Sequence, residues 1–252
     1  MSEIPFSQLS PSILDEESRL RVARQILAVL EDHLKSSGLR GRRVLDLGCS
    51  SGIITKFLAD VSDSIVGIDV DTEALARTRT EPKKLNARFL VMSGSDLAFR
   101  SGTFDVVICN QVYYWFDDPE RLFAEVHRVL KPGGCCFLAS VNKYTLWEPQ
   151  YRLPFLAFLP RPVADFSVRA AGKGSRFGCH YLSFWGLGRL SRRFIVHRYT
   201  ARVIKDPERY NFKRLSTLRT LTKALPIRLC EVLEPLSPNF VWVLEKPRSV
   251  SP

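Results

Sequence analysis

The sequence has no pair of cysteines at the C-x-x-C spacing of zinc ribbons and redox motifs, although it contains six cysteines. It also has no apolar run close to the roughly 20 residues that a transmembrane helix needs. Its first ten residues lack the basic and apolar segments of a secretory signal. No group of His, Cys, Asp or Glu shows the spacing of metal ligands, so we expect no metal site. These absences indicate reduced cysteines and a cytoplasmic protein, with peripheral attachment to the inner face of a membrane as the alternative.

Charge is distributed unevenly along the 252 residues, whose formal net charge is +11. Residues 1–140 contain 17 basic and 19 acidic side chains, whereas residues 141–252 contain 20 basic and 7 acidic ones. A basic segment of this size is typical of proteins that meet nucleic acid, a membrane surface or an anionic substrate. A basic surface that only keeps the protein in solution is the alternative.

Short apolar segments alternate with amphipathic ones in the first 141 residues. The expected strands are Val44–Gly48, Ser64–Asp69, Ala87–Met92, Phe104–Asn110 and Cys135–Val141, and the expected helices are 12–37, Ile53–Ala59, Thr72–Thr80 and Asp117–Leu130. Because these strands are apolar on both faces, we expect an α/β fold in which helices cover both sides of a parallel sheet.

The second half of the chain is less regular. Residues 142–180 are rich in proline, glycine and aromatic residues and are interpreted as a long excursion. The elements expected after it are a helix over Leu182–Phe194, a strand over Phe194–Ile204, a helix over Glu208–Leu225 and a strand over Phe240–Leu244. We interpret residues 1–252 as a single domain made of an N-terminal helix (1–40), a ligand-binding core (41–141), an insertion (142–193) and the final strands and helix (194–252).

A glycine turn joins the first strand to the next helix, in the segment Asp46–Gly52. Such a turn directs backbone N–H groups at a ligand, and its small residues let the ligand come close. Seventeen residues after Gly52, Asp69 stands at the end of the second strand, where an acid can accept hydrogen bonds from both hydroxyls of a ribose. Asp46 as a cap of the turn, and Asp69 as an ordinary turn residue, are the structural alternatives.

Several motifs distinguish this turn from a dinucleotide-binding fingerprint. It has the form D-x-G-x-S-x-G and lacks the G-x-G-x-x-G spacing, and a further acid, Asp96, follows the third strand. Residues 40–141 resemble the class I S-adenosylmethionine-dependent methyltransferases, in particular the branch that includes the ubiquinone and menaquinone biosynthesis methyltransferases. The resemblance rests on Asp46–Gly52, Asp69, Gly94–Leu97 and Phe104–Asn110, together with the stretch Arg128–Gly134. It implies a Rossmann-like, doubly wound sheet that is mostly parallel with an antiparallel last strand.

The resemblance also implies S-adenosyl-L-methionine as the cofactor. The cofactor-binding positions that it implies are Asp46, Gly48, Cys49, Gly52, Asp69, Val70, Asp96, Leu97 and Asn110. Among these, Gly48 and Gly52 would line the methionine part, and Asp46 would help to hold its amino group. Asp69 would bind the ribose hydroxyls, and Asp96 with Leu97 would contact the adenine. The family usually has glycine at the position of Ser50, so the resemblance leaves open whether the serine weakens cofactor binding.

Three residues are candidates for the catalytic side of the site: Asn110, Tyr113 and His180. By the resemblance, Asn110 would face the sulfonium and the methyl acceptor. Tyr113 begins a run of four aromatic residues, Tyr113–Phe116, that could stack on an acceptor or close the core. His180 could act as general base on a hydroxyl acceptor, with a backbone hydrogen bond as the structural alternative.

The helix expected over Leu182–Phe194 has two faces. Its apolar face suits the sheet, whereas Arg189, Arg192 and Arg193 lie on the other face, with Tyr181 and Trp185 beside them. This arginine face is either simply solvated or contacts an anionic membrane surface. The expected function is therefore methyl transfer to a small-molecule or lipid-linked acceptor. The alternatives are an RNA methyltransferase acting on tRNA or rRNA, and a non-catalytic protein that binds S-adenosylmethionine.

Overall fold

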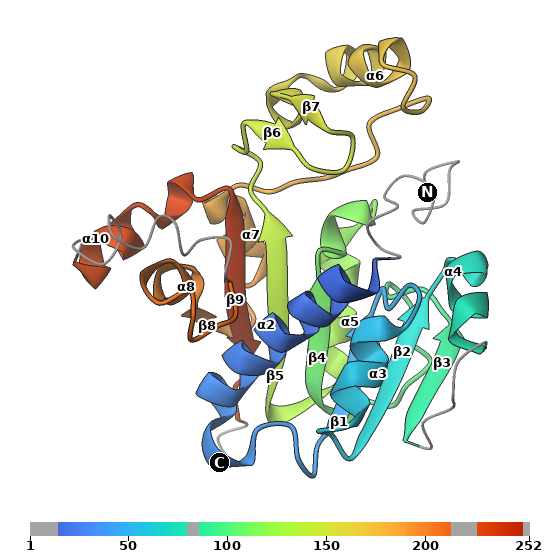
Figure 1. Ribbon diagram of the computed structural model, residues 1–252, viewed down its shortest axis with the longest axis vertical. Helices are drawn as coiled ribbons and strands as arrows, with labels where there is room; N and C mark the ends of the chain where they lie inside the picture. The colour runs from blue at the N-terminus through green and yellow to red at the C-terminus, as the bar shows by residue number, and fades with distance from the viewer. Residues whose placement is uncertain (1–14, 80–85, 213–225, 249–252) are drawn as a thin grey trace.

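The computed structural model describes residues 15–79, 86–212 and 226–248. A seven-stranded sheet forms its centre, with the strand order β3-β2-β1-β4-β5-β9-β8 (Figure 1). The parallel strands are β1 (Arg43–Leu47), β2 (Ser64–Asp69), β3 (Ala87–Val91), β4 (Phe104–Asn110) and β5 (Leu130–Val141). β9 (Asn239–Glu245) runs antiparallel between β5 and β8 (Ile195–Arg198). The predicted α/β fold with an antiparallel last strand is confirmed.

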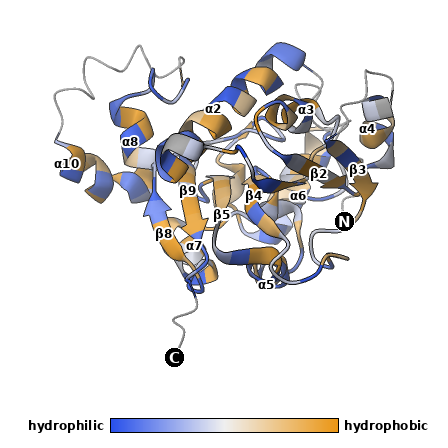
Figure 2. Cartoon of the chain, turned by 90° about the horizontal axis from the view of Figure 1, so that it is seen from below, coloured by the Kyte–Doolittle hydropathy of each residue, from blue (hydrophilic) through white to orange (hydrophobic). Residues whose placement is uncertain are grey.

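Helices cover both faces of the sheet, as Figure 2 shows from below. One face packs against α2 (Glu16–Leu34), α3 (Ile53–Ala59) and α8 (Thr200–Lys205), and the other packs against α5 (Pro119–Val129) and α7 (Phe184–Leu190). Alternate residues of each strand supply the two cores: in β4, Val106 and Ile108 point to the first face, and Val107 and Cys109 to the second. This alternation explains why the strands are apolar without interruption. The remaining short helices are α4 (Thr72–Ala76) and α10 (Ile227–Val232).

Two predicted elements differ from the structure. The strand expected over Phe194–Ile204 ends at Arg198, because Tyr199 closes β8 and Thr200–Lys205 turns into α8. There, Val203 packs into the core under α2 instead of continuing the ladder. The helix expected over Glu208–Leu225 is wrong for its described part, because residues 208–212 form a turn; the rest lies outside the described residues, as do positions 12–14 of the first helix and Thr80.

Residues 142–180, expected as an irregular excursion, contain regular structure. They form a short hairpin of β6 (Trp147–Glu148) and β7 (Leu153–Pro154), a 3-10 helix over Leu156–Phe158, and α6 (Arg161–Ala170). We call residues 142–180 the cap, because they lie beyond the ends at which β4 and β5 point (Figure 1). Ala164 and Val168 of α6 belong to the same core cluster as the sheet, so the cap is packed onto the body.

All six cysteines are buried and free, as expected for reduced thiols. Among the helices within residues 15–79, 86–212 and 226–248, none combines the length and apolar character that crossing a bilayer requires.

Candidate functional site

The turn between β1 and α3 lies at the end of the sheet that carries the cap. Gly48 and Gly52 adopt left-handed conformations, with φ of 67° and 75°. A Cβ at Gly48 would lie 2.5 Å from Val112, and one at Gly52 would lie 2.6 Å from Phe89. Both positions therefore require glycine for backbone conformation and for space. The Gly48 N–H donates to the Ile68 carbonyl at 2.8 Å, which holds the turn against the end of β2.

Ser50 is also left-handed, with φ of 50°, and is buried. Its N–H donates to Asp69 Oδ2 at 2.7 Å, and the N–H of Asp71 donates to Oδ1 at 2.9 Å. Each carboxylate oxygen of Asp69 therefore has a lone pair left for a further donor. Burial raises the pKa of Asp69, and the backbone hydrogen bonds oppose that shift. The carboxylate is thus fixed at the end of β2 by the turn itself.

Asp46 lies behind the turn and is only 3% exposed. Its Oδ2 accepts a hydrogen bond of 2.6 Å from the Thr55 hydroxyl, and burial raises its pKa to about 6. Arg19, from the first turns of α2, offsets this burial by its positive charge. The charges of Asp46 and Asp69 in turn act on Arg19, whose own pKa is lowered by burial. Nothing in the periodic pattern of α2 distinguished this arginine from its neighbours, and sequence reasoning missed it.

A cavity of about 390 Å³ opens in front of the turn and Asp69. Its lining includes Gly48, Asp69 and Val70 among the residues that the sequence singled out. The remaining lining residues are Leu47, Ile68, Met92, Ser93, Gly94, Ser95, Gln111, Val112, Trp115, Phe116, Asp117, Asp118 and Arg121. Six expected positions do not line this cavity: Asp46, Cys49, Gly52, Asp96, Leu97 and Asn110.

The two residues predicted to contact the adenine, Asp96 and Leu97, differ in their exposure. Asp96 is exposed, next to the lining residue Ser95, whereas Leu97 is buried and its N–H donates to Glu125 Oε2 at 2.8 Å. Asn110 is half-buried at the end of β4, directly before Gln111, which lines the cavity in a left-handed conformation.

The aromatic run after β4 is also divided. Tyr113 and Tyr114 are fully buried, and the Tyr113 hydroxyl accepts from the Leu182 N–H at 3.1 Å. Burial raises the pKa of Tyr113 to about 12, and its ring packs in the core instead of lining the cavity. Trp115 and Phe116, in contrast, line the cavity. Tyr113 and Tyr114 therefore close the core, whereas stacking on an acceptor stays a prediction for Trp115 and Phe116.

A second cavity of about 250 Å³ adjoins the first and shares two lining residues with it, Trp115 and Asp117. Its other lining residues come from the cap: Arg161, Asp165, Arg176, Phe177, Gly178 and His180. His180 thus lies beside the ligand cavity, although it is 70 residues from β4 in sequence. Its N–H donates to the Tyr114 carbonyl at 2.7 Å, which ties the cap to the loop after β4.

The His180 ring is half-buried and lies against a guanidinium. Arg161 Nη2 is 2.9 Å from Nδ1 and 3.0 Å from Nε2, and Asp117 Oδ1 is 3.8 Å from Nε2. Burial, followed by the charge of Arg161, lowers the pKa of His180 below its ordinary value. The imidazole is therefore neutral at pH 7 and able to accept a proton.

The expected arginine face is present on a shorter helix. Arg189 lies on α7, and Arg192 and Arg193 follow its end; all three are exposed. Tyr181, expected beside them, is instead buried under the cap, where its hydroxyl donates to Glu148. The reason is that α7 starts only at Phe184, so Tyr181 belongs to the segment that packs on the loop after β4.

Comparison with known proteins places the chain among methyltransferases. Residues 45–138 match the family model described as "Methyltransferase domain". The ubiquinone biosynthesis O-methyltransferase of Pseudomonas aeruginosa is 29% identical over 171 residues, covering 64% of this chain and 72% of its own length.

Two solved structures share the fold. One is the methyltransferase in a complex with the Haloferax volcanii Trm112 methyltransferase activator, with a TM-score of 0.60, 18% identity, and coverage of 98% of this chain and 96% of that one. The other is an S-adenosylmethionine-dependent methyltransferase from Mesorhizobium loti, with a TM-score of 0.56, 17% identity, and coverage of 82% and 92%.

Proposed function

The chain is an S-adenosylmethionine-dependent methyltransferase of class I architecture, and from this premise we propose that it methylates a small-molecule or lipid-linked acceptor held in the second cavity. The observation that carries the proposal is the wall that the two cavities share, formed by Trp115 and Asp117. A ligand in the first cavity and one in the second would meet at this wall. Residues of the cap line the second cavity on the other side, which favours a compact acceptor group over a folded RNA.

The residues of the first cavity fit the cofactor chemically. Asp69 offers one free lone pair on each oxygen, which suits the two adjacent hydroxyls of a ribose. Gly48 keeps the turn open for close approach to the methionine part. Arg19 is a half-buried cation near the turn, and we assign to it the carboxylate of that part. Asp46, behind the turn, supplies negative charge toward the amino group.

When bound, S-adenosylmethionine supplies a methyl group activated by its sulfonium. The chain's own contribution is to orient the acceptor and to exclude water. Trp115 and Phe116 are the apolar walls suited to that exclusion. His180 is neutral at pH 7 and lines the acceptor cavity, so it can take the proton of a hydroxyl acceptor. Asn110, at the end of β4, remains a candidate for holding the reacting groups.

We further propose that the protein is cytoplasmic and meets its acceptor at an anionic membrane surface. Arg189, Arg192 and Arg193 support this proposal, because they are exposed and two of them, Arg189 and Arg192, border a shallow apolar groove with Trp185 and Trp242.

Calorimetry with S-adenosylhomocysteine, combined with transfer of a labelled methyl group, tests the proposal. We expect binding that Asp69→Asn weakens at least about 10-fold, since a hydrogen bond to a charged group contributes about 1.5–3 kcal/mol. The matched control is Asp63→Asn, because Asp63 is an exposed acid at the other end of β2. When whole-cell extract supplies the acceptor, the labelled methyl group should be recovered in the small-molecule and lipid fractions. Label that enters only RNA, or binding that is indifferent to Asp69, would overturn the proposal.

A further inference from the structure

The outer surface of the cap exposes large apolar side chains. Leu146 and Phe166 are each 65% exposed, Trp147 is 57% exposed and Phe155 is 56% exposed. With Tyr144, Phe158 and Val163, which are also exposed, these residues form what we call the apolar cap surface. Single exposed apolar residues need no explanation, but seven within 23 consecutive residues do.

These side chains are neighbours in space. The ring centroids of Tyr144 and Phe158 are 5.9 Å apart, and those of Phe155 and Phe158 are 6.4 Å apart. The Phe155 N–H donates to the Leu146 carbonyl at 2.7 Å, and Trp147 pairs with Pro154 across the hairpin. The surface is therefore continuous around the hairpin and the 3-10 helix.

α6 extends the surface next to the 3-10 helix, against which it packs. Ala164 and Val168, four residues apart, face the core, whereas Val163 and Phe166, three residues apart, are exposed. The helix is thus apolar on two sides, although only one of them is covered by protein.

The backbone holds part of this surface outward at a conformational cost. Phe155 is left-handed, with φ of 57°, and so is Arg152, with φ of 53°. For a bulky residue such a conformation is strained, and strained residues cluster where a ligand or partner is met. Here the strained backbone carries an aromatic ring that is 56% exposed and touches only the edge of the cap's own aromatic cluster, at Phe158.

Charge on the cap is almost entirely positive at its surface. The segment contains six basic and two acidic residues. Glu148 is fully buried and bonded to Tyr181, and Asp165 accepts from the Phe177 N–H at 2.8 Å. Four of the basic residues are exposed beside the apolar cap surface: Lys143 and Arg152, before and within the hairpin, and Arg161 and Arg169, on α6. Tryptophan and phenylalanine ringed by arginine and lysine are typical of proteins that lie in the interface of an anionic bilayer.

We propose that the apolar cap surface inserts into the interface of an anionic lipid bilayer, and that the cap presents the acceptor cavity to that bilayer. Arg161, Phe177 and His180 line the second cavity from the same cap, so a lipid-linked acceptor would reach it from the membrane side. This part rests on the proposed function, whereas bilayer binding itself does not. In Figure 1 the cap stands away from the helices that cover the sheet, which gives it access to a flat surface.

Vesicle binding tests the proposal without turnover. The wild type should sediment with vesicles of phosphatidylglycerol and phosphatidylcholine, and much less with phosphatidylcholine alone. A cap variant with four substitutions should bind these vesicles at least tenfold more weakly. It combines Leu146→Ser, Trp147→Ser, Phe155→Ser and Phe166→Ser. The matched control combines Ile227→Ser, Val232→Ser and Leu236→Ser, on α10 and the turn after it, because these side chains are also exposed. Unchanged affinity of all three proteins for S-adenosylhomocysteine shows that they are folded.

A second measurement identifies the part of the protein that contacts the bilayer. Brominated lipid should quench tryptophan fluorescence of the wild type, and Trp147→Phe should remove most of that quenching, whereas Trp185→Phe should not. Equal binding by the cap variant and the wild type, or quenching that depends on Trp185, would overturn the proposal in favour of the arginine face. Bilayer binding without methyl transfer to any lipid would overturn only the acceptor assignment.

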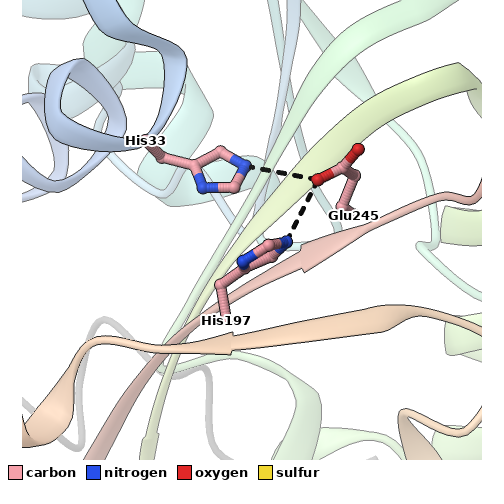
Figure 3. A group of neighbouring side chains, drawn as sticks. All are labelled: His33, His197 and Glu245. Atoms are coloured by element: carbon pink, nitrogen blue, oxygen red, sulfur yellow. Dashed lines mark hydrogen bonds and ion pairs between the residues drawn. The ribbon is translucent and has the colours of Figure 1, made fainter.

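A different observation carries a second inference. His33 near the end of α2, His197 on β8 and Glu245 at the end of β9 converge on one point (Figure 3). Glu245 Oε2 is 3.0 Å from His197 Nε2 and 3.9 Å from His33 Nε2, and the centroids of the two imidazole rings are 4.7 Å apart. The three residues lie far apart in sequence, which is why spacing predicted no metal site.

Two imidazoles and one carboxylate are a ligand set that zinc accepts, with a fourth position left for water. Tetrahedral bonds of about 2.0–2.1 Å put ligand atoms about 3.3 Å apart, and the potential ligand atoms here all lie within 4.8 Å of one another. All three side chains are half-buried and so open to an ion. Two cations act on the site, Lys35 and Arg202. Arg202, on α8, pairs with Asp32 at 3.6 Å, which offsets its charge.

We propose that His33, His197 and Glu245 bind a zinc ion that joins α2 to β8 and β9. Titration of chelator-treated protein with zinc alone should show one site and a raised melting temperature. His33→Ala and Glu245→Gln should each weaken binding at least tenfold, whereas His127→Ala, elsewhere on the surface, should not. Unchanged affinity of each variant for S-adenosylhomocysteine shows that the variant is folded. Absence of binding, or binding indifferent to His33 and Glu245, would overturn the proposal.

Discussion

The N–H of Ser50 donates to the carboxylate of Asp69 across 2.7 Å, and this contact joins the turn after β1 to the end of β2. It exists because Ser50 adopts a left-handed conformation, with φ of 50°. The serine thus preserves the backbone geometry that glycine would adopt without strain.

The first prediction concerns Ser50. Because an L-residue in the left-handed region costs about 1 kcal/mol relative to glycine, we expect Ser50→Gly to leave the free energy of unfolding unchanged or raise it by up to about 1 kcal/mol. Ser50→Val should lower it, since a β-branched side chain is the least tolerant of this conformation. Urea denaturation measures both. A less stable glycine variant would show that the serine side chain contributes contacts of its own.

The second prediction concerns Asp46 and pH. Burial raises the pKa of Asp46 to about 6, so between its unfolded value and pH 6 the folded state binds the proton more tightly. Stability therefore falls as pH rises through this window. Asp46→Asn, which can still accept from Thr55, should raise the free energy of unfolding at pH 7.5 by about 1–3 kcal/mol. The gain should vanish near pH 4; denaturation of the ligand-free protein at the two pH values provides the check.

The third prediction tests the carboxylate partner. If Arg19 holds the methionine carboxylate, Arg19→Gln should weaken binding of S-adenosylhomocysteine by roughly tenfold or more. It should hardly change the binding of methylthioadenosine, which has the ribose and adenine but no carboxylate. Calorimetry with the two ligands separates this role from a general effect on folding. Equal losses for both ligands would contradict it.

The fourth prediction concerns His180. Its pKa is lowered by burial and by Arg161, so the acid limb of the activity profile should lie below pH 6.5. His180→Gln should reduce kcat by roughly 10²–10⁴-fold for a hydroxyl acceptor and leave cofactor affinity unchanged. Arg161→Gln should move the limb to higher pH, because it removes a positive charge beside the imidazole. An unshifted limb in Arg161→Gln would exclude His180 as the titrating base.

The sheet could be predicted because its strands are largely apolar on both faces and alternate with amphipathic segments. The turn at Gly48 and the acid at Asp69 were predictable for a related reason: their spacing follows from the strand–turn–helix connection. The remainder depends on contacts between distant segments. No local sequence pattern indicates these contacts. They are the packing of Tyr113 and Tyr114 against residues near 181, the burial of Arg19, and the proximity of His33 to His197.

The wall formed by Trp115 and Asp117 belongs to both cavities, so a ligand that moves either side chain from one cavity would change the shape of the other. Any such effect is a coupling free energy, and coupling between two bound ligands is reciprocal. An acceptor analogue that tightens S-adenosylhomocysteine binding must itself be bound more tightly, by the same factor, when the cofactor product is present. A single indole ring would then make product release and acceptor entry thermodynamically interdependent.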